Sequence, residues 1–413
     1  MKVKYGVLLV TALVIALLVP GFGRGGASQT ITFLTAPWGV PPDQALLKAF
    51  TDRSGITVQV ISAPSAEMYT KVQVASAGRR SPADVIFLTE EAPSFIVAPG
   101  YMEPLDARIA RSADLNAGDI ERMDFWSVGG NVQGITTYVQ LVMMDYNAKR
   151  LGAGGFAKPA GTWDELRRQS VALKQKGVDQ YPIAFGAIDW SWFLMALSAG
   201  DPMFDGGLNP VFSNAGSPAR KAMATLIGFF ATDKVITPDL LTKVTPHDVF
   251  MGGTAVYHQA WQGSLAVMNN AKISKQAPDV QYLLMPEQHF TWSLDAAIGL
   301  SRFSAKKDAG WEFIKWYVSP ESQRAIYKAV GLVPSRKSLQ QALNSEGAIQ
   351  GFETMVEQAK YVHQLPRTVK WWGPWTQSVT EAIRKAAQGQ LTPDAAVDAV
   401  AKRWNELKAQ YKQ

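Results

Sequence analysis

Residues 81–106, SPADVIFLTEEAPSFIVAPGYMEPLD, contain the apolar run Asp84–Leu88 (DVIFL), which predicts a buried strand. Toward the N-terminus, Thr30–Leu34 (TITFL) and Ile56–Ser62 (ITVQVIS) predict two further strands, because both are rich in β-branched residues. Helical segments separate the three strands, and the first of them starts at about Pro42. This alternation of strands and helices is typical of a parallel sheet covered by helices, so we predict an α/β fold.

Several helix starts are marked by a Ser or Thr directly before a proline. The hydroxyl can cap the helix, and the proline suits the first turn, where its missing N–H breaks no helical bond. The pairs are Ser217-Pro218, Thr245-Pro246, Ser319-Pro320 and Thr392-Pro393, and Thr162–Glu165 (TWDE) fits a capping box. The last helix should bury the apolar residues that recur at helical intervals: Val397, Val400, Ala401, Trp404 and Leu407. Trp311 and Trp316 fall on similar helical stripes and are predicted to be core residues.

The composition is that of an ordinary globular protein: of 413 residues, 47% are hydrophobic and 18% are charged. The chain contains no cysteine, which excludes disulfides, thiolate metal sites, cysteine nucleophiles and a lipidated cysteine anchor. Its four histidines show no H-E-x-x-H spacing. We therefore expect no metal and no cofactor.

Residues 1–28 are predicted to be a cleavable secretory signal peptide. Lys2 and Lys4 precede the apolar run Val7–Val19, which is too short to span a bilayer comfortably. A retained membrane anchor is the alternative. Removing this segment, which also contains Arg24, lowers the net charge from +6 to +3. Because the remainder has no basic stripe, we expect no nucleic-acid partner. The signal sequence, without a cysteine for lipid attachment, predicts a free, soluble periplasmic monomer.

Four segments together resemble a known family. Residues 81–106 are similar to its "PDV" strand, cleft loop, helix and "G-x-x-x-P-L" turn. Residues 144–166 contain DYNAKRL and TWDEL, residues 250–261 read FMGGTAVYHQAW, and residues 310–336 contain GWEFIKW, SPESQ and GLVPSR. Their order resembles that in the extracellular solute-binding proteins of bacterial ABC importers, in the carbohydrate group that includes maltose-binding protein. The sequence departs from the family pattern at Ala148, Gly253 and Val256, where Lys, Lys and Met are usual.

The resemblance implies a two-lobe periplasmic binding protein fold, with discontinuous lobes around a central ligand cleft. Carried onto this sequence, lobe one takes residues 29–139 and 293–335, and lobe two takes residues 140–292 and 336–413. The chain would cross between the lobes near Val139, Trp292 and Arg336. The family also implies a function: binding a sugar, from a monosaccharide to an oligosaccharide, and delivering it to the permease subunits of an ABC transporter without catalysis.

Tryptophans outside helical stripes are the first candidate ligand contacts. The C–H faces of sugars stack on aromatic rings, and their hydroxyl rims need paired donors and acceptors. The candidates are Trp38, Trp190, Trp261, Trp292, Trp371 and Trp372, which we expect on loops. Trp261 and Trp292 are preferred, because the resemblance places both near a lobe crossing. For each ring, packing in the core or on the surface is the alternative.

The polar candidates are Glu90, Tyr138, Asp189 and Arg367. Glu90 follows the DVIFL strand on a loop where the resemblance implies a polar ligand contact; a solvated helix start is the alternative. Tyr138 precedes the first crossing, and Asp189 stands beside Trp190. Arg367 resembles the "P-R" of the family before its last helices, and a surface salt bridge is its alternative role.

Two other functions remain open. The same fold could bind a polar anion such as glycerol phosphate, for which Arg336, Arg367 and Lys370 are the candidate cations. A secreted glycoside hydrolase could instead use Glu90 or Glu91 together with a distant second acid.

Overall fold

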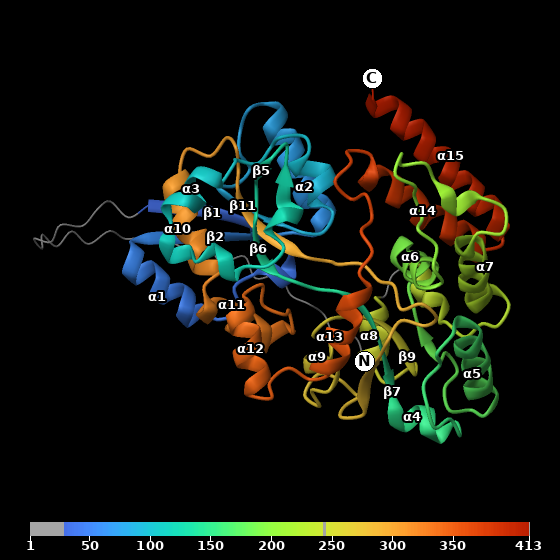
Figure 1. Cartoon of the computed structure of the whole chain (residues 1–413). Helices are drawn as coiled ribbons and strands as arrows, with labels where there is room; N and C mark the ends of the chain where they lie inside the picture. The colour runs from blue at the N-terminus through green and yellow to red at the C-terminus, as the bar shows by residue number, and fades with distance from the viewer. Residues whose placement is uncertain (1–28, 243–244, 413) are drawn as a thin grey trace, which may run out of the picture.

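The computed structural model of the chain describes residues 29–242 and 245–412, so the predicted signal peptide lies outside the described residues. Two sheets form the centres of two lobes that lie side by side (Figure 1). Between residues 29 and 412, apart from 243–244, no helix is both long and apolar enough to cross a membrane.

The first lobe contains a mixed five-stranded sheet in the order β2-β1-β3-β11-β6. Its strands are β1 (Gln29–Thr35), β2 (Ile56–Ser62), β3 (Val85–Leu88), β6 (Ile135–Tyr138) and β11 (Ala296–Leu300). The three strands predicted from sequence are present, and β1 pairs in parallel with both β2 and β3. The sheet as a whole is not parallel, because β11 runs antiparallel to both β3 and β6. A short ribbon of β4 (Ser127–Val128) and β5 (Asn131–Val132) lies nearby.

Helices cover this sheet and close the first core. They are α1 (Gln44–Ser54), α2 (Ser65–Ala77), α3 (Asp106–Arg111), α10 (Lys307–Tyr317) and α11 (Pro320–Val330). Phe33 of β1 packs edge-on against Phe313 and Tyr317 of α10, with ring centroids 5.1 and 5.5 Å apart. Trp311 and Trp316 are buried in α10, as predicted.

The second lobe is built on a four-stranded sheet in the order β10-β7-β9-β8. Its strands are β7 (Val142–Asn147), β8 (Ile183–Ala184), β9 (Tyr257–Trp261) and β10 (Val280–Leu283). Its helices are α4 (Ala148–Ala153), α5 (Trp163–Gln175), α6 (Asp189–Ser198), α7 (Pro218–Ala231), α8 (Pro246–Met251), α9 (Leu265–Met268), α14 (Trp372–Ala387) and α15 (Pro393–Lys412). Two more helices, α12 (Lys337–Ser345) and α13 (Phe352–Gln358), follow α11 along the chain.

An aromatic cluster fills the core among α6, α7, α14 and α15. Trp375 stacks on Phe193 with ring centroids 5.6 Å apart and meets Trp404 edge-on at 5.0 Å. The residues predicted to line the buried face of α15 are all buried, Trp404 completely. The chain contains 13 tryptophans, and this cluster gives several of them a packing role without any ligand.

The predicted helix starts are confirmed. In each case a Thr or Ser hydroxyl accepts the backbone N–H three residues later, at Thr162, Ser217, Thr245, Ser319 and Thr392.

Two segments predicted as loops are helix starts instead. Residues 187–192, AIDWSW, enter α6 at Asp189, because an acid at the first turn favours a helix; residues 370–375, KWWGPW, enter α14, whose first turn accommodates Pro374.

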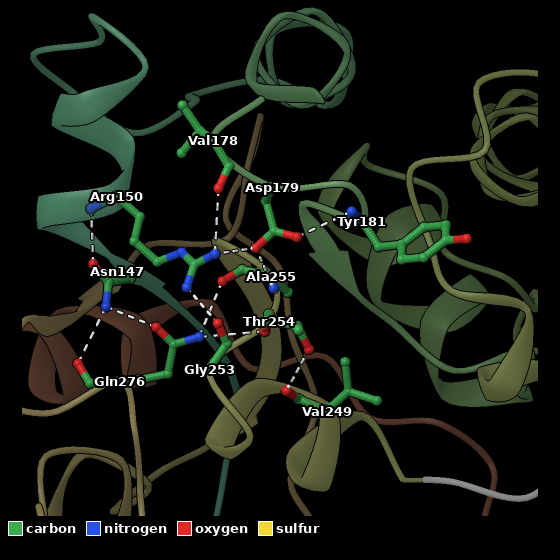
Figure 2. Close-up of polar contacts among 10 residues, drawn as sticks. All are labelled: Asn147, Arg150, Val178, Asp179, Tyr181, Val249, Gly253, Thr254, Ala255 and Gln276. Carbon is green, nitrogen blue, oxygen red and sulfur yellow. Dashed lines mark hydrogen bonds and ion pairs between the residues drawn. The ribbon is translucent and has the colours of Figure 1, made fainter. Parts of the chain in front are cut away.

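A buried polar network holds the start of β9 (Figure 2). The carboxylate of Asp179 forms an ion pair with Arg150 and accepts the backbone N–H of Ala255 at 2.7 Å. The Nε2 of Gln276 donates to the Ala255 carbonyl at 3.0 Å, so both peptide groups of Ala255 are bound. Ala255 has φ 77°, in the left-handed region that a non-glycine residue adopts only at a cost. The network therefore fixes the direction in which β9 leaves toward the first lobe.

The two lobes touch backbone to backbone at Gly263 and Gly331. Gly263 follows β9, and Gly331 caps α11 in the first lobe. A Cβ placed on Gly263 would lie 1.9 Å from the carbonyl oxygen of Gly331, and one placed on Gly331 would lie 2.6 Å from that of Gly263. Only glycine permits this approach, because any side chain at either position would push the two segments apart.

Candidate functional site

A cavity of about 370 Å³ lies between the two lobes. Its wall combines residues of the first lobe, of the second lobe and of the crossing segments: Trp38, Glu90, Tyr138, Gln140, Trp190, His247, Ala260, Trp261, Val267, Leu294, Ala329, Val330 and Leu332. Its volume falls within the range of small-molecule sites, roughly 300–1,000 Å³. Of the ten site residues predicted from the sequence, five are brought together here: Trp38, Glu90, Tyr138, Trp190 and Trp261.

Three tryptophan rings form the aromatic part of the wall. Trp38 follows β1 and is 38% exposed, and its Nε1 donates to the hydroxyl of Tyr138 at 3.2 Å. Trp261 ends β9, and Trp190 lies in the first turn of α6. Trp38 belongs to the first lobe and the other two to the second. A ligand in the cavity can therefore meet indole rings from both lobes.

The polar part of the wall comprises Glu90, Gln140, His247 and the Tyr138 hydroxyl. Burial raises the pKa of Glu90, and nearby Arg367 opposes this shift only in part. The oxygens of the Glu90 carboxyl can accept hydrogen bonds from ligand hydroxyls. Gln140 is held by its backbone N–H, which donates to Asp295 at 3.1 Å. These groups suit an uncharged ligand that carries several hydroxyls.

Behind Trp190 a narrow space of about 10 Å³ adjoins the cavity, no larger than one water molecule needs. Four further predicted site residues line it: Asp189, Trp292, Arg367 and Trp372. Glu91 lies here as well. Burial raises its pKa to about 8, and the neighbouring Glu90 and Asp189 add to that shift. Burial also raises the pKa of Asp189 to about 7, while its hydrogen bond from Thr380 opposes the shift. These carboxyl groups therefore hold protons at a pH where exposed acids have lost them.

Replacing Glu91 by glutamine should flatten the fall in stability as the pH rises from about 4.5 to about 8. An unfolded chain releases this proton near pH 4.5 and the folded protein near pH 8, so between these values the folded state binds more protons. The free energy of unfolding then decreases as the pH rises, by an amount on the order of a few kcal/mol. Denaturant unfolding between pH 5 and 9 should give a shallower slope for Glu91→Gln. The matched control is Glu353→Gln at an exposed position of α13, which should keep the wild-type slope. A wild-type slope in Glu91→Gln itself would contradict the burial of this proton.

Arg367 joins the two lobes instead of facing the main cavity. Its guanidinium donates to the Glu90 carbonyl at 2.6 Å and to the Ser293 carbonyl, and it lies over the Phe125 ring at 5.1 Å. It is buried, so the alternative of a surface salt bridge does not apply. By holding the Glu90 backbone, Arg367 positions the loop that brings the Glu90 carboxyl into the wall.

Three tryptophans expected on loops at the cleft lie in the second core instead. Trp292 is 2% exposed and packs edge-on against Trp190 and Phe193, with ring centroids 6.3 and 6.1 Å apart. Trp372 begins α14 and packs against Trp375 at 5.1 Å, and Trp371 packs against Trp404 at 5.7 Å. None of the three lines the main cavity. The expectation that Trp292 matches Trp261 is therefore corrected: Trp292 supports the Trp190 ring from behind.

Sequence reasoning missed His247 and Gln140 as wall residues. His247 stands in the first turn of α8, directly after the Thr245-Pro246 start that the sequence does mark. No local pattern indicates that this helix start faces the cleft, because the facing elements are far away in the chain. Gln140 lies in the crossing segment two residues after Tyr138, and this position is the one sequence signal that could have identified it.

The family profile described as bacterial extracellular solute-binding protein matches residues 45–354, about three quarters of the chain. The chain belongs to this family. The matched range runs through both lobes. It includes wall residues from both, such as Glu90 after β3 and Trp261 at the end of β9. This solute-binding protein is therefore related to proteins that bind solutes outside the cell.

Curated relatives are similar over part of their length. The diacetylchitobiose-binding protein DasA of Streptomyces coelicolor is 24% identical over 283 residues, which are 63% of this chain and 65% of that protein. The maltotriose-binding protein of Pyrococcus abyssi is 21% identical over 319 residues, 74% of this chain and 66% of that protein. The chain thus spans just under two thirds of the length of these relatives.

Solved structures show the same two-lobe fold. The maltose-bound MalE3 of T. maritima superposes with a TM-score of 0.81 at 18% identity, covering 92% of this chain and 99% of the other. The substrate-binding protein Lmo0181 of Listeria monocytogenes, in complex with cycloalternan, superposes equally well at 19% identity, with the same shares covered. At such identities the likeness establishes the fold of this solute-binding protein, a two-lobe α/β architecture.

Proposed function

We propose that this protein binds a sugar of one or a few units in the interlobe cavity and delivers it to the permease subunits of an ABC importer. The observation that carries the proposal is the arrangement of Trp38, Trp190 and Trp261 around one cavity, whose polar lining includes Glu90, Gln140 and His247. Indole rings cover the C–H faces of a pyranose, and the polar groups pair with its hydroxyls. The names of the relatives, a diacetylchitobiose-binding and a maltotriose-binding protein, support the same class of ligand.

The charge of the cavity wall disfavours the anion alternative. Among residues 29–242 and 245–412, no Lys or Arg lines the cavity. Arg336 is buried elsewhere, where it donates to the Val318 carbonyl at 2.6 Å and lies 3.4 Å from Asp119, and Lys370 is exposed outside the wall. Arg367 is already bound to two carbonyls. A phosphate in this cavity would meet the Glu90 carboxyl, and no Lys or Arg of the part of the chain that the structure describes lines the wall to balance its charge.

The same wall disfavours glycoside hydrolysis. A glycosidase needs two carboxyl groups flanking the scissile bond. Of the residues that the structure describes, Glu90 is the one acid in the cavity wall, while Glu91 and Asp189 line the narrow space behind Trp190, which has no room for a sugar. We therefore propose binding without catalysis.

Export, lobe boundaries and partners complete the proposal. The signal peptide would be removed after residue 28 or close to it, leaving a free periplasmic monomer without bound nucleic acid or cofactor. The lobes would comprise residues 29–139 with 293–335 and residues 140–292 with 336–413. Binding would draw the two lobes together by hinge motion at the crossing segments, and the permease would recognise the closed form.

A thermal-shift screen of the secreted chain tests this function. A ligand that binds only the native state raises the melting temperature, by an amount that grows with its concentration relative to Kd. We expect maltose, maltotriose or diacetylchitobiose to raise it, and glycerol 3-phosphate to leave it unchanged. A shift with the phosphate and none with a broad panel of sugars and polyols would overturn the proposal in favour of the anion.

A further inference from the structure

A chain of three hydrogen-bonded side chains leads from the core of the second lobe to the cavity. Asp145 of β7 accepts from Nδ1 of His258 of β9 at 2.8 Å, although the two residues are 113 positions apart. The Nε2 of His258 contacts Nδ1 of His247 of α8, also at 2.8 Å. Asp145 and His258 are completely buried, while His247 lines the cavity. Buried ionisable groups are rare and need such partners.

The carboxylate at the inner end sets the direction of each bond. An ionised Asp145 can only accept, so Nδ1 of His258 carries a proton and, in a neutral ring, its Nε2 is an acceptor. Because Nε2 of His258 accepts, Nδ1 of His247 must carry the proton of this bond. In a neutral His247 ring, Nε2 then keeps a free lone pair. A carboxylate holds the imidazole of serine-protease triads in one tautomer by the same logic. The second oxygen of Asp145 accepts from the Ser264 hydroxyl at 3.1 Å, which fixes the carboxylate in turn.

The outer end of the chain meets the aromatic wall. The His247 ring stands edge-on to the Trp261 ring, with centroids 4.6 Å apart. Nε2 of His247 has no hydrogen-bond partner among the described residues, and His247 lines the cavity. Within residues 29–242 and 245–412, no cluster of three or more His, Asp or Glu residues could hold a metal ion.

We propose that Asp145 and His258 are positioning residues that hold neutral His247 with its Nε2 lone pair toward the cavity, as an acceptor for one hydroxyl of a ligand stacked on Trp261. This inference rests on the proposed function, because it assumes a ligand with hydroxyl groups. It also makes the site selective, because a ligand without a donor at that place leaves a buried acceptor unpaired.

The charge state of His247 agrees with this assignment. Burial lowers its pKa to about 3, and the neighbouring His258 adds to the shift. The other titratable groups of this region are Asp145, Tyr282, whose hydroxyl contacts Ser264, and Glu90 in the wall of the first lobe. At neutral pH the side chain of His247 is therefore a neutral imidazole and not an imidazolium.

The nitrogen NMR signals of ¹⁵N-histidine-labelled protein test the chain of bonds without any ligand. The sequence holds four histidines, so His→Gln variants assign the signals. At pH 7 we expect Nδ1 to be protonated and Nε2 unprotonated in both His247 and His258. In Asp145→Asn, where the amide can donate to His258, both tautomers should reverse. A proton on Nε2 of His247 in the wild type, or a doubly protonated His258, would overturn the proposal, because the group facing the ligand would then be a donor.

Binding measurements test the acceptor role. His247→Phe keeps a ring but removes the acceptor, and we expect it to weaken maltotriose or diacetylchitobiose binding by about 3–10-fold. His363→Phe, at a ring outside the cavity wall, is the matched control and should bind as the wild type does. Unchanged affinity in His247→Phe would contradict the acceptor role. If no sugar binds the wild type, the proposed function fails, and the tautomers still decide the arrangement of the hydrogen-bonded chain.

Discussion

Trp261→Ala is expected to weaken sugar binding by about 10–150-fold. Trp261 ends β9, lines the interlobe cavity and is partly exposed. Its ring can cover one pyranose face, and losing it removes buried apolar area together with the stacking geometry, roughly 1.5–3 kcal/mol. Because Trp261 packs only at the edge of a hydrophobic core, its loss should lower the melting temperature of the ligand-free protein only slightly.

Calorimetric titration of wild type, Trp261→Ala and Trp261→Phe measures this effect. The phenylalanine variant keeps a ring over the sugar and should recover most of the affinity. If Trp261→Ala keeps its affinity but loses several kcal/mol of stability, Trp261 is a core residue. The aromatic platform would then have to consist of Trp38 and Trp190.

Trp292→Ala should have the opposite effect, a loss of about 3–5 kcal/mol in the free energy of unfolding. Trp292 is buried against Phe193 and the back of Trp190, so truncation leaves a large cavity in the second core. Chemical denaturation measures the loss, and Trp292→Phe should restore part of it. Binding by the folded fraction should fall less than in Trp261→Ala. A variant with wild-type stability and severely reduced affinity would place Trp292 at the ligand after all.

The sequence predicted most of the fold, because local signals determine it. The strands at 30–34, 56–62 and 84–88 follow from their apolar, β-branched composition, and the capped helices follow from Ser or Thr before Pro. The antiparallel strands β6 and β11 were not predicted, because most of the second lobe separates them in the sequence before they pair in the first lobe. The helical starts at Asp189 and Trp372 were missed, because the aromatic residues there were assigned to loops.

The site was predicted only in part, because burial depends on contacts distant in sequence. Trp261 and Trp292 have similar polar neighbours, but residues 290–296 alternate between apolar and polar side chains. That alternation is typical of an extended segment packed on a core and could have separated the two rings. No comparable signal exists for His247, whose partners His258 and Asp145 meet it only after β7, β9 and α8 come together.

Titration calorimetry of the secreted chain with maltose, maltotriose and diacetylchitobiose, repeated on Trp261→Ala, tests the central claim that a sugar occupies the interlobe cavity. The structure predicts saturable binding of at least one sugar with one site per chain, weakened by at least tenfold in Trp261→Ala. Heat of binding with glycerol 3-phosphate and none with any sugar would contradict the claim. Equal sugar affinity in the wild type and in Trp261→Ala would contradict it as well, because the sugar would then bind elsewhere.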